Sequence, residues 1–318
     1  MSKLQRLEEL LASYKSVCIG YSGGVDSVFL AVVARDVLGP QRVLAVTGKS
    51  ASYPDVQWQV ARDVAKQFAI PHLEIDTDEM HDANYLANPT NRCYFCKTEL
   101  WSKLVPVAAS YGLATIVDGS NADDASDYRP GAQAAREHGV KSPLMDVGLT
   151  KQEIRELSQA RGLPTWDQPS APCLSSRLPY GLAVTPERLR QVETAEAIVR
   201  DAGIREFRVR HHGDVARVEV APAEMAHAVS IADQLAASIR SLGFARVLLD
   251  VEGYRRGALN ELINLKRVAN DDDVSAAGHD SDIAVVAAPL SDIERVRARC
   301  ASLKQIGFRY VAVELRSA

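Results

Sequence analysis

The sharpest chemical signal is the run Ser22-Gly23-Gly24-Val25-Asp26-Ser27, which follows an apolar stretch and precedes a helical pattern. Glycine lets the backbone approach a phosphate closely, and a helix N-terminus offers unpaired N–H groups with a partial positive charge. Ser22 and Ser27 add hydroxyl donors. Asp26 repels a phosphate by itself, so it implies a Mg²⁺ ion that bridges its carboxylate and a pyrophosphate. The run therefore predicts a pyrophosphate-binding loop rather than a plain strand-to-helix turn.

This loop differs from two familiar nucleotide motifs. It lacks the lysine of the GxxxxGK[ST] pattern, and it lacks the GxGxxG spacing of dinucleotide sites. We therefore do not expect a nicotinamide cofactor.

Three of the five cysteines form the second chemical group. Cys93 and Cys96 are spaced as CxxC, and Cys173 lies in a proline-rich stretch. Three thiolates suit a [4Fe–4S] cluster with one open iron, which could hold a sulfide. A structural CxxC beside a sulfur-donating Cys173 is the second interpretation. Zinc, with His72 or His81 as a further ligand, is the third.

The other two cysteines, Cys18 and Cys300, are expected to be small core residues.

The elements that must position these residues alternate between strand and helix. Strands are predicted at 17–21, 43–47, 72–75 and 115–118, with helices at 27–37, 56–68 and 97–111. This order predicts an α/β fold with a doubly wound parallel sheet. Ligands of such sheets bind beyond the carboxyl ends of the strands, so the loops after Tyr21, Thr47 and Asp118 should form the site.

The rest of the chain predicts a second, smaller, mixed α/β domain. Residues 217–252 and 284–316 form a near-repeat of strand, helix and strand, in which Pro222 matches Pro289 and Phe244 matches Phe308. The predicted organisation runs in five parts: a domain with the pyrophosphate-binding loop at 1–165, an exposed interdomain loop at 166–184, a substrate or oligomerisation domain at 185–265, a linker at 266–282, and a repeat-like addition at 283–318.

Composition limits the partners. The formal net charge is −4 and the sequence pI about 6.0, whereas proteins that grip long nucleic acids usually carry a basic footprint. No apolar run approaches the roughly 20 residues needed to cross a bilayer. We expect a cytoplasmic protein that binds neither membrane nor nucleic acid.

The motifs together resemble a known family. The SGGxDS run resembles the PP-loop ATP pyrophosphatases, whose fold is adenine nucleotide alpha hydrolase-like. With DGSNADDASDYRPG (118–131), NRCYFCK (91–97), PCLSSRLPYG (172–181) and GYRRGALNE (253–261), the chain resembles the LarE family of ATP-dependent sulfur transferases. That resemblance implies adenylation of the carboxylates of a pyridinium biscarboxylic acid mononucleotide and their conversion to thiocarboxylates. The products serve the nickel-pincer nucleotide cofactor of lactate racemase and related enzymes.

The resemblance also implies roles for particular residues. The family's sulfur-donating cysteine falls on Cys173, and in the single-cysteine form of the family it is consumed and becomes dehydroalanine. Some members carry the three-cysteine arrangement instead. Asp118 and Asn121 lie where ATP or substrate contacts are expected.

Four arginines and a glutamate complete the predicted site. Arg177 could supply positive charge to the Cys173 thiolate. Arg208, Arg210 and Arg255 are expected to bind the nucleotide phosphate of the substrate. Glu219 is a candidate metal ligand.

Other functions remain open at this point. A tRNA thiolase of the same superfamily and an amidase-coupled synthetase are the enzymatic alternatives, and a non-catalytic iron–sulfur or nucleotide-binding scaffold is the alternative from another class. A sulfide donor and a homo-oligomer are expected partners.

Overall fold

The computed structural model describes residues 1–126, 130–255, 273–278, 282–305 and 307–315. The chain divides into two compact units, Met1–Cys173 and Leu174–Ala318. The predicted linker at 266–282 lies mostly outside the described residues, as do residues 256–261 of the GYRRGALNE motif. No helix in the described ranges is both long and apolar enough to cross a membrane.

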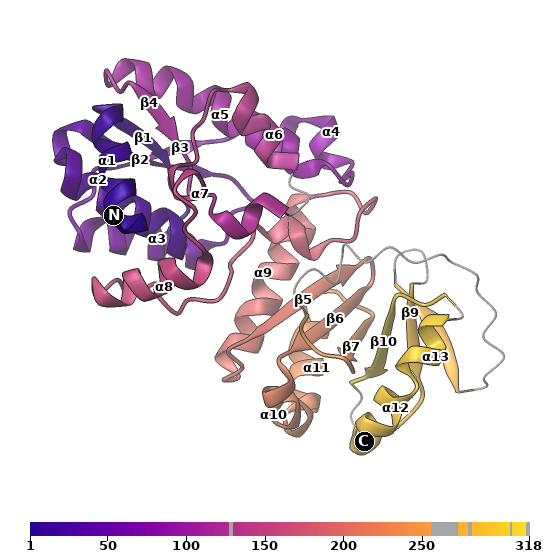
Figure 1. Ribbon diagram of the computed structural model, residues 1–318. Helices are drawn as coiled ribbons and strands as arrows, with labels where there is room; N and C mark the ends of the chain where they lie inside the picture. The colour runs from indigo at the N-terminus through magenta and orange to yellow at the C-terminus, as the bar shows by residue number, and fades with distance from the viewer. Residues whose placement is uncertain (127–129, 256–272, 279–281, 306, 316–318) are drawn as a thin grey trace. The chain divides into compact units, whose positions relative to one another are not determined.

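Unit 1 is built on a parallel sheet in the order β3-β2-β1-β4 (Figure 1). Its strands are β1 (Val17–Gly20), β2 (Val43–Lys49), β3 (His72–Asp76) and β4 (Thr115–Val117). Its helices are α1 (Lys3–Tyr14), α2 (Val25–Leu38), α3 (Asp55–Gln67), α4 (Ala83–Leu86), α5 (Arg92–Ser110), α6 (Pro130–Glu137), α7 (Pro143–Asp146) and α8 (Lys151–Ala160). The predicted doubly wound α/β fold is confirmed.

Both faces of this sheet are covered, which explains the almost wholly apolar central strands. Helices α1, α2, α3 and α8 bury one face, and α5 and α6 bury the other (Figure 1). Cys18 lies in the second of these cores, as predicted. Since all four strands run the same way, their carboxyl ends meet at one edge, where the loops after β1, β2 and β4 emerge.

One predicted helix start is wrong in a way that affects the site. The helix expected from residue 97 begins at Arg92, because the turn at Asn88 (φ 52°) and Pro89 ends the preceding segment and nothing after it breaks a helix. Cys93 and Cys96 therefore occupy the first turns of α5. Because residues three apart share a helix face, the two thiols point the same way.

Unit 2 is a six-stranded mixed sheet in the order β5-β6-β7-β10-β9-β8. Its strands are β5 (Phe207–His212), β6 (Val215–Val220), β7 (Arg246–Asp250), β8 (Val274–Ala277), β9 (Ile283–Val286) and β10 (Tyr310–Glu314). Its helices are α9 (Pro186–Asp201), α10 (Met225–Ser230), α11 (Ala232–Arg240), α12 (Ile293–Ala298) and α13 (Cys300–Gln305), and one core joins them to a single sheet face.

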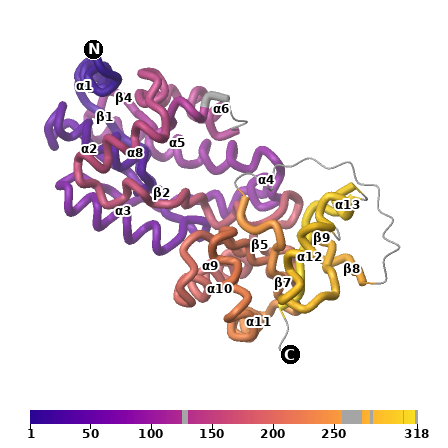
Figure 2. Tube along the Cα trace, turned by 60° about the horizontal axis from the view of Figure 1, so that its bottom comes forward, coloured from indigo at the N-terminus to yellow at the C-terminus, as the bar shows by residue number. Residues whose placement is uncertain are grey.

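The two copies of the near-repeat meet antiparallel at β7 and β10. Each copy forms parallel strands joined by helices, β6 to β7 and β9 to β10. In the second copy the connecting helices α12 and α13 lie beside β9 (Figure 2). Across the junction Val313 pairs with Leu249, Ala312 with Asp250, and Glu314 with Leu248. This register is symmetric about the first pair, as in an isologous contact between identical subunits. The described residues of the second copy, 283–305 and 307–315, thus belong to the same sheet and core as the first copy.

The stretch predicted to be an exposed loop between domains is only partly exposed. Leu174, Ser175, Arg177 and Leu178 are buried, within or just after a short 3₁₀ helix at Leu174–Arg177. The prediction of exposure is therefore wrong for the second half of this loop, because two leucines pack inward and the arginine finds a buried carboxylate.

Candidate active site

The glycine-rich loop has the backbone that an anion site requires. Gly23 has φ +65°, and a Cβ there would lie 2.7 Å from Ala61, so a side chain is excluded both by conformation and by space. Gly24 begins α2 without any side-chain cap. Ser27 Oγ accepts from the Ser22 N–H at 3.2 Å and donates to the Gly24 carbonyl at 3.1 Å, which closes the loop on itself. The helix N-terminus therefore remains available to a ligand.

Asp26, in the first turn of α2, faces a lysine from far along the chain. Its Oδ2 lies 2.6 Å from Lys151 Nζ, and its Oδ1 accepts from Asn121 Nδ2 at 3.4 Å. The loop after β4 packs tightly here, since a Cβ on Gly119 would lie 3.0 Å from the Ser27 nitrogen. The structure thus brings Asn121 to Asp26 as predicted for a shared site.

The Asp118 carboxylate accepts hydrogen bonds from its own loop and from Ser142. Its carboxylate accepts from the Ser120 N–H and hydroxyl at 3.1 and 3.0 Å and from Ser142 Oγ at 2.8 Å. Its first effect is to shape the turn that carries Gly119 and Asn121.

Sequence reasoning missed Lys151. It follows Thr150, whose capping box with Glu153 starts α8 as predicted. The Lys151 N–H donates to Asp123 at 2.9 Å, while its ammonium reaches Asp26. The only signal in the sequence was the position of this lysine at a helix N-terminus. A cation is electrostatically unfavourable there, which suggests that the lysine is kept for another role.

The three candidate cysteines all belong to unit 1 and interact electrostatically. Cys93 as a whole is exposed, yet burial of its sulfur is the first cause that raises its pKa, and the charge of Cys173 is the second. Burial also raises the pKa of Cys96, followed by the charges of Glu79 and Cys173. These thiols lie in one neighbourhood, although the described side chains contain no group of three such residues placed to hold a metal ion.

Glu79, beside Cys96, was not singled out from the sequence. It is 3% exposed, and its Oε1 accepts from Ser50 Oγ at 2.5 Å and Ser52 Oγ at 3.1 Å. Its Oε2 is buried without a hydrogen-bond partner among the described residues. In the sequence, a single acidic residue after a strand gives no indication that its side chain is buried or lies near a cysteine.

In unit 2, Arg177 is bound to a carboxylate. Its Nε and Nη2 donate to the two oxygens of Glu196, each at 2.9 Å, and both side chains are buried. Glu196 also accepts from the Val209 N–H at 3.2 Å. Arg177 was predicted to supply positive charge to Cys173. The structure instead gives this guanidinium a bidentate partner that compensates its charge.

The predicted arginine set is partly assembled. Burial lowers the pKa of Arg208, and the charges of Arg177 and Arg210 lower it further, so these three guanidiniums are neighbours. Arg208 also lies 5.0 Å from the ring of Tyr254. Arg255 forms an ion pair with Glu252 at 3.0 Å.

Glu219 lies between two arginines. Its carboxylate is 2.9 Å from Arg210 and 2.9 Å from Arg217, and it is buried. Two arginines already neutralise this carboxylate. The prediction that Glu219 binds a metal ion therefore does not fit the structure. Arg210 also donates to the Ser176 carbonyl at 2.9 Å, which ties the segment after Cys173 to the sheet of unit 2.

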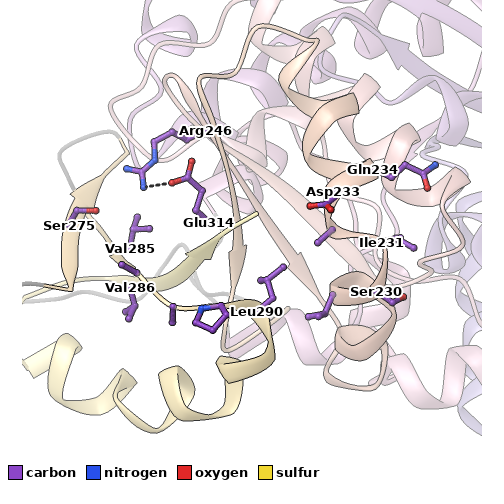
Figure 3. Close-up of a pocket in the computed structure, with 15 residues that line it drawn as sticks. Ser230, Ile231, Asp233, Gln234, Arg246, Ser275, Val285, Val286, Leu290 and Glu314 are labelled. Atoms are coloured by element: carbon purple, nitrogen blue, oxygen red, sulfur yellow. Dashed lines mark hydrogen bonds and ion pairs between the residues drawn. The ribbon is translucent and has the colours of Figure 1, made fainter. Parts of the chain in front are cut away.

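A cavity of about 750 Å³ in unit 2 is separate from these residues (Figure 3). Ser230 and Asp233 line one side, and the Arg246–Glu314 ion pair at 3.0 Å lines another. None of the predicted site residues lines it. The motif residues, rather than this cavity, define the candidate site.

The chain is similar to several known proteins. Residues 5–96 match the family model described as NAD synthase. An uncharacterized protein of Synechocystis sp. is 44% identical over 264 residues, which are 82% of this chain and 98% of that protein. Among solved structures, NMN synthetase from Francisella tularensis has a TM-score of 0.43 and 19% identity, covering 54% of this chain and 76% of that one.

The pyridinium-3,5-bisthiocarboxylic acid mononucleotide synthase of Lactiplantibacillus plantarum is 32% identical over 268 residues, which are 84% of this chain and 97% of that enzyme. A glycine loop with this backbone, on a parallel α/β sheet, is the feature expected of an ATP pyrophosphatase. The chain therefore belongs to the LarE family of PP-loop ATP pyrophosphatases.

Proposed function

We propose that this protein uses ATP to adenylate the carboxylates of a pyridinium biscarboxylic acid mononucleotide and then converts them to thiocarboxylates. The observation that carries the proposal is that one unit holds both the pyrophosphate loop, with Asp26 at 2.6 Å from Lys151, and the three interacting cysteines. An activating site and a sulfur nucleophile are the two parts that this reaction needs.

In the first step the loop of Ser22–Ser27 binds the phosphates of ATP. The N-terminus of α2 stabilises the negative charge that grows on pyrophosphate as the bond between the α and β phosphates breaks. Asp26, a carboxylate in reach of these phosphates, fits a Mg²⁺ ion carried by ATP. Lys151 then leaves Asp26 and donates to a phosphate oxygen.

In the second step a thiolate attacks the acyl adenylate and AMP leaves. We assign the attack to Cys173, because it falls on the sulfur-donating cysteine of the family. Burial raises the pKa of Cys93 and of Cys96 and so disfavours the thiolate form of both. The product is a thioester on Cys173. Loss of the Cα proton and cleavage of the Cβ–S bond then release the thiocarboxylate and leave dehydroalanine.

A [4Fe–4S] cluster was the leading expectation from the sequence. The described side chains do not assemble a three-ligand group, so we derive no step through a cluster. Iron and acid-labile sulfide analysis of anaerobically purified protein tests it directly.

The deciding experiment is a reaction with ATP, Mg²⁺ and the pyridinium biscarboxylic acid mononucleotide. We expect pyrophosphate release that depends on the mononucleotide, together with a thiocarboxylate product seen by mass spectrometry. Bulk tRNA replaces the mononucleotide in a parallel reaction. Pyrophosphate release without any sulfur-containing product, or stimulation by tRNA alone, contradicts the proposal.

A further inference from the structure

The carbonyl of Ser22, inside the pyrophosphate loop, accepts hydrogen bonds from two side chains. Gln57 Nε2 donates to it at 2.9 Å and the Tyr53 hydroxyl at 3.0 Å. Gln57 is 3% exposed and belongs to α3. In a planar trans peptide the N–H points opposite to the carbonyl, so these bonds also orient the N–H of Gly23 away from α3. Both side chains therefore set the orientation of a peptide in the anion site.

The bond to Ser22 dictates the polarity of a longer chain of hydrogen bonds. Because Gln57 must present its NH₂ group to a carbonyl, its Oε1 faces the other way and needs a donor. Gln168 Nε2 supplies that donor at 2.8 Å. This orientation leaves Gln168 Oε1 buried without a partner in the described structure. Turning the Gln168 amide over would set two acceptors against each other, so the chain has a single direction.

Gln168 lies five residues before Cys173, and a second route joins the same segment to the loop. Arg155 of α8 donates to the carbonyls of Trp166 and Gln168 at 2.9 and 2.8 Å. Four residues earlier on the same helix face, Lys151 binds Asp26. The segment before Cys173 is thus tied to the pyrophosphate loop through α3 and through α8.

We infer that Gln57, Gln168 and Arg155 are positioning residues that couple nucleotide binding in the loop to the placement of Cys173. A nucleotide that fixes the Ser22–Gly23 peptide also fixes Gln57, then Gln168, and so the segment that carries the thiol. This inference rests on the proposed function in requiring that the loop binds ATP. It adds that ATP is sensed at the sulfur nucleophile before any chemistry occurs.

The test measures alkylation of Cys173 by iodoacetamide in the full chain, followed by peptide mass spectrometry, with and without Mg²⁺ and a non-hydrolysable ATP analogue. In the wild type we expect the analogue to slow alkylation about 10-fold, the size of effect that one partly buried hydrogen bond can transmit. In Gln168→Ala the protection should fall below about 2-fold. Analogue affinity, measured by calorimetry, should stay within about 3-fold, because Ser22 keeps both of its donors.

Two further variants sharpen the result. Gln168→Glu keeps the size of the side chain but cannot donate to Gln57, so it should lose protection even if the alanine variant folds poorly. Gln59→Ala removes an exposed glutamine of α3, the helix that carries Gln57. In this control the analogue should protect Cys173 as well as it does in the wild type. Full protection in both Gln168 variants overturns the inference, as does a wild type that binds the analogue without any change at Cys173. A wild type that binds no analogue overturns the proposed function itself.

Discussion

Replacing Asp26 by Asn separates the fold of the pyrophosphate loop from its chemistry. The substitution keeps the shape of the side chain and its contact with Asn121, but removes the charge that faces Lys151 at 2.6 Å. The side chains of the pair are 29% and 23% exposed, so losing their attraction should cost no more than about 1 kcal/mol of folding free energy. That corresponds to a fall of about 2–4 °C in Tm.

The effect on adenylation should be far larger. If Asp26 holds Mg²⁺ against the pyrophosphate, the variant loses a charge interaction that strengthens as the phosphate bond breaks. Contacts of this kind are worth about 3–4 kcal/mol, and about 1.4 kcal/mol corresponds to tenfold in rate, so the rate should fall about 100- to 1,000-fold. Lys151→Met should chiefly raise the KM for ATP, because it removes a phosphate contact but leaves Asp26.

The assay is pyrophosphate release at saturating ATP, Mg²⁺ and mononucleotide, with Tm measured on the same samples. Asp63→Asn, which removes an exposed carboxylate from α3, is the matched control and should behave as the wild type. Pyrophosphate release by Asp26→Asn within about threefold of the wild-type rate would refute Asp26 as a metal ligand. A loss of more than about 10 °C in Tm would instead show that the ion pair is mainly structural.

Four further predictions concern sulfur, substrate, a buried ion pair and pH. After turnover, intact-protein mass spectrometry should show a loss of about 34 Da at Cys173, and unchanged mass during continued turnover contradicts its sacrifice. Arg208→Ala should weaken binding of the mononucleotide about 10- to 150-fold with ATP affinity unchanged, and an equal loss of ATP affinity contradicts a substrate role. Arg210→Ala should lower the free energy of unfolding by about 3 kcal/mol, measured by urea denaturation, because it removes a partner of the buried Glu219 carboxylate. An unchanged free energy of unfolding would contradict this. Burial, then the charge of Arg188, lowers the pKa of His211 to about 4. The folded protein therefore keeps this ring neutral while the unfolded chain takes up a proton below about pH 6.5. Stability should fall between about pH 6.5 and pH 4, with about 2 kcal/mol lost at pH 5, and His211→Gln should remove that loss.

The pyrophosphate loop could be predicted from its residues because its geometry is local. A glycine at φ +65°, a second glycine at the helix start and two serines that close the loop all lie within six residues of sequence. The parallel sheet followed equally well from the alternation of strands and helices, since each apolar strand must be buried on both faces.

The partners of charged residues depended on the tertiary structure. Alternating arginines on a strand look the same whether they are solvated, paired or bound to a ligand. Only the fold shows that Arg210 pairs with Glu219 from the neighbouring strand and that Arg177 pairs with Glu196 from α9. Buried carboxylates compensate both, and the roles expected of Arg177 and Glu219 change accordingly.

The sequence by itself determined the fold class, the family motifs and the anion-binding turn, because local backbone preferences and the pattern of apolar residues encode them. Tertiary structure alone decided that Lys151 reaches Asp26 across 125 residues of chain, and that Gln168 reaches Gln57 across 111. Such contacts carry no local signal. A side chain's hydrogen bonds are set by whatever the packed sheet brings within about 3 Å of it, and that distance exists only once the chain has folded.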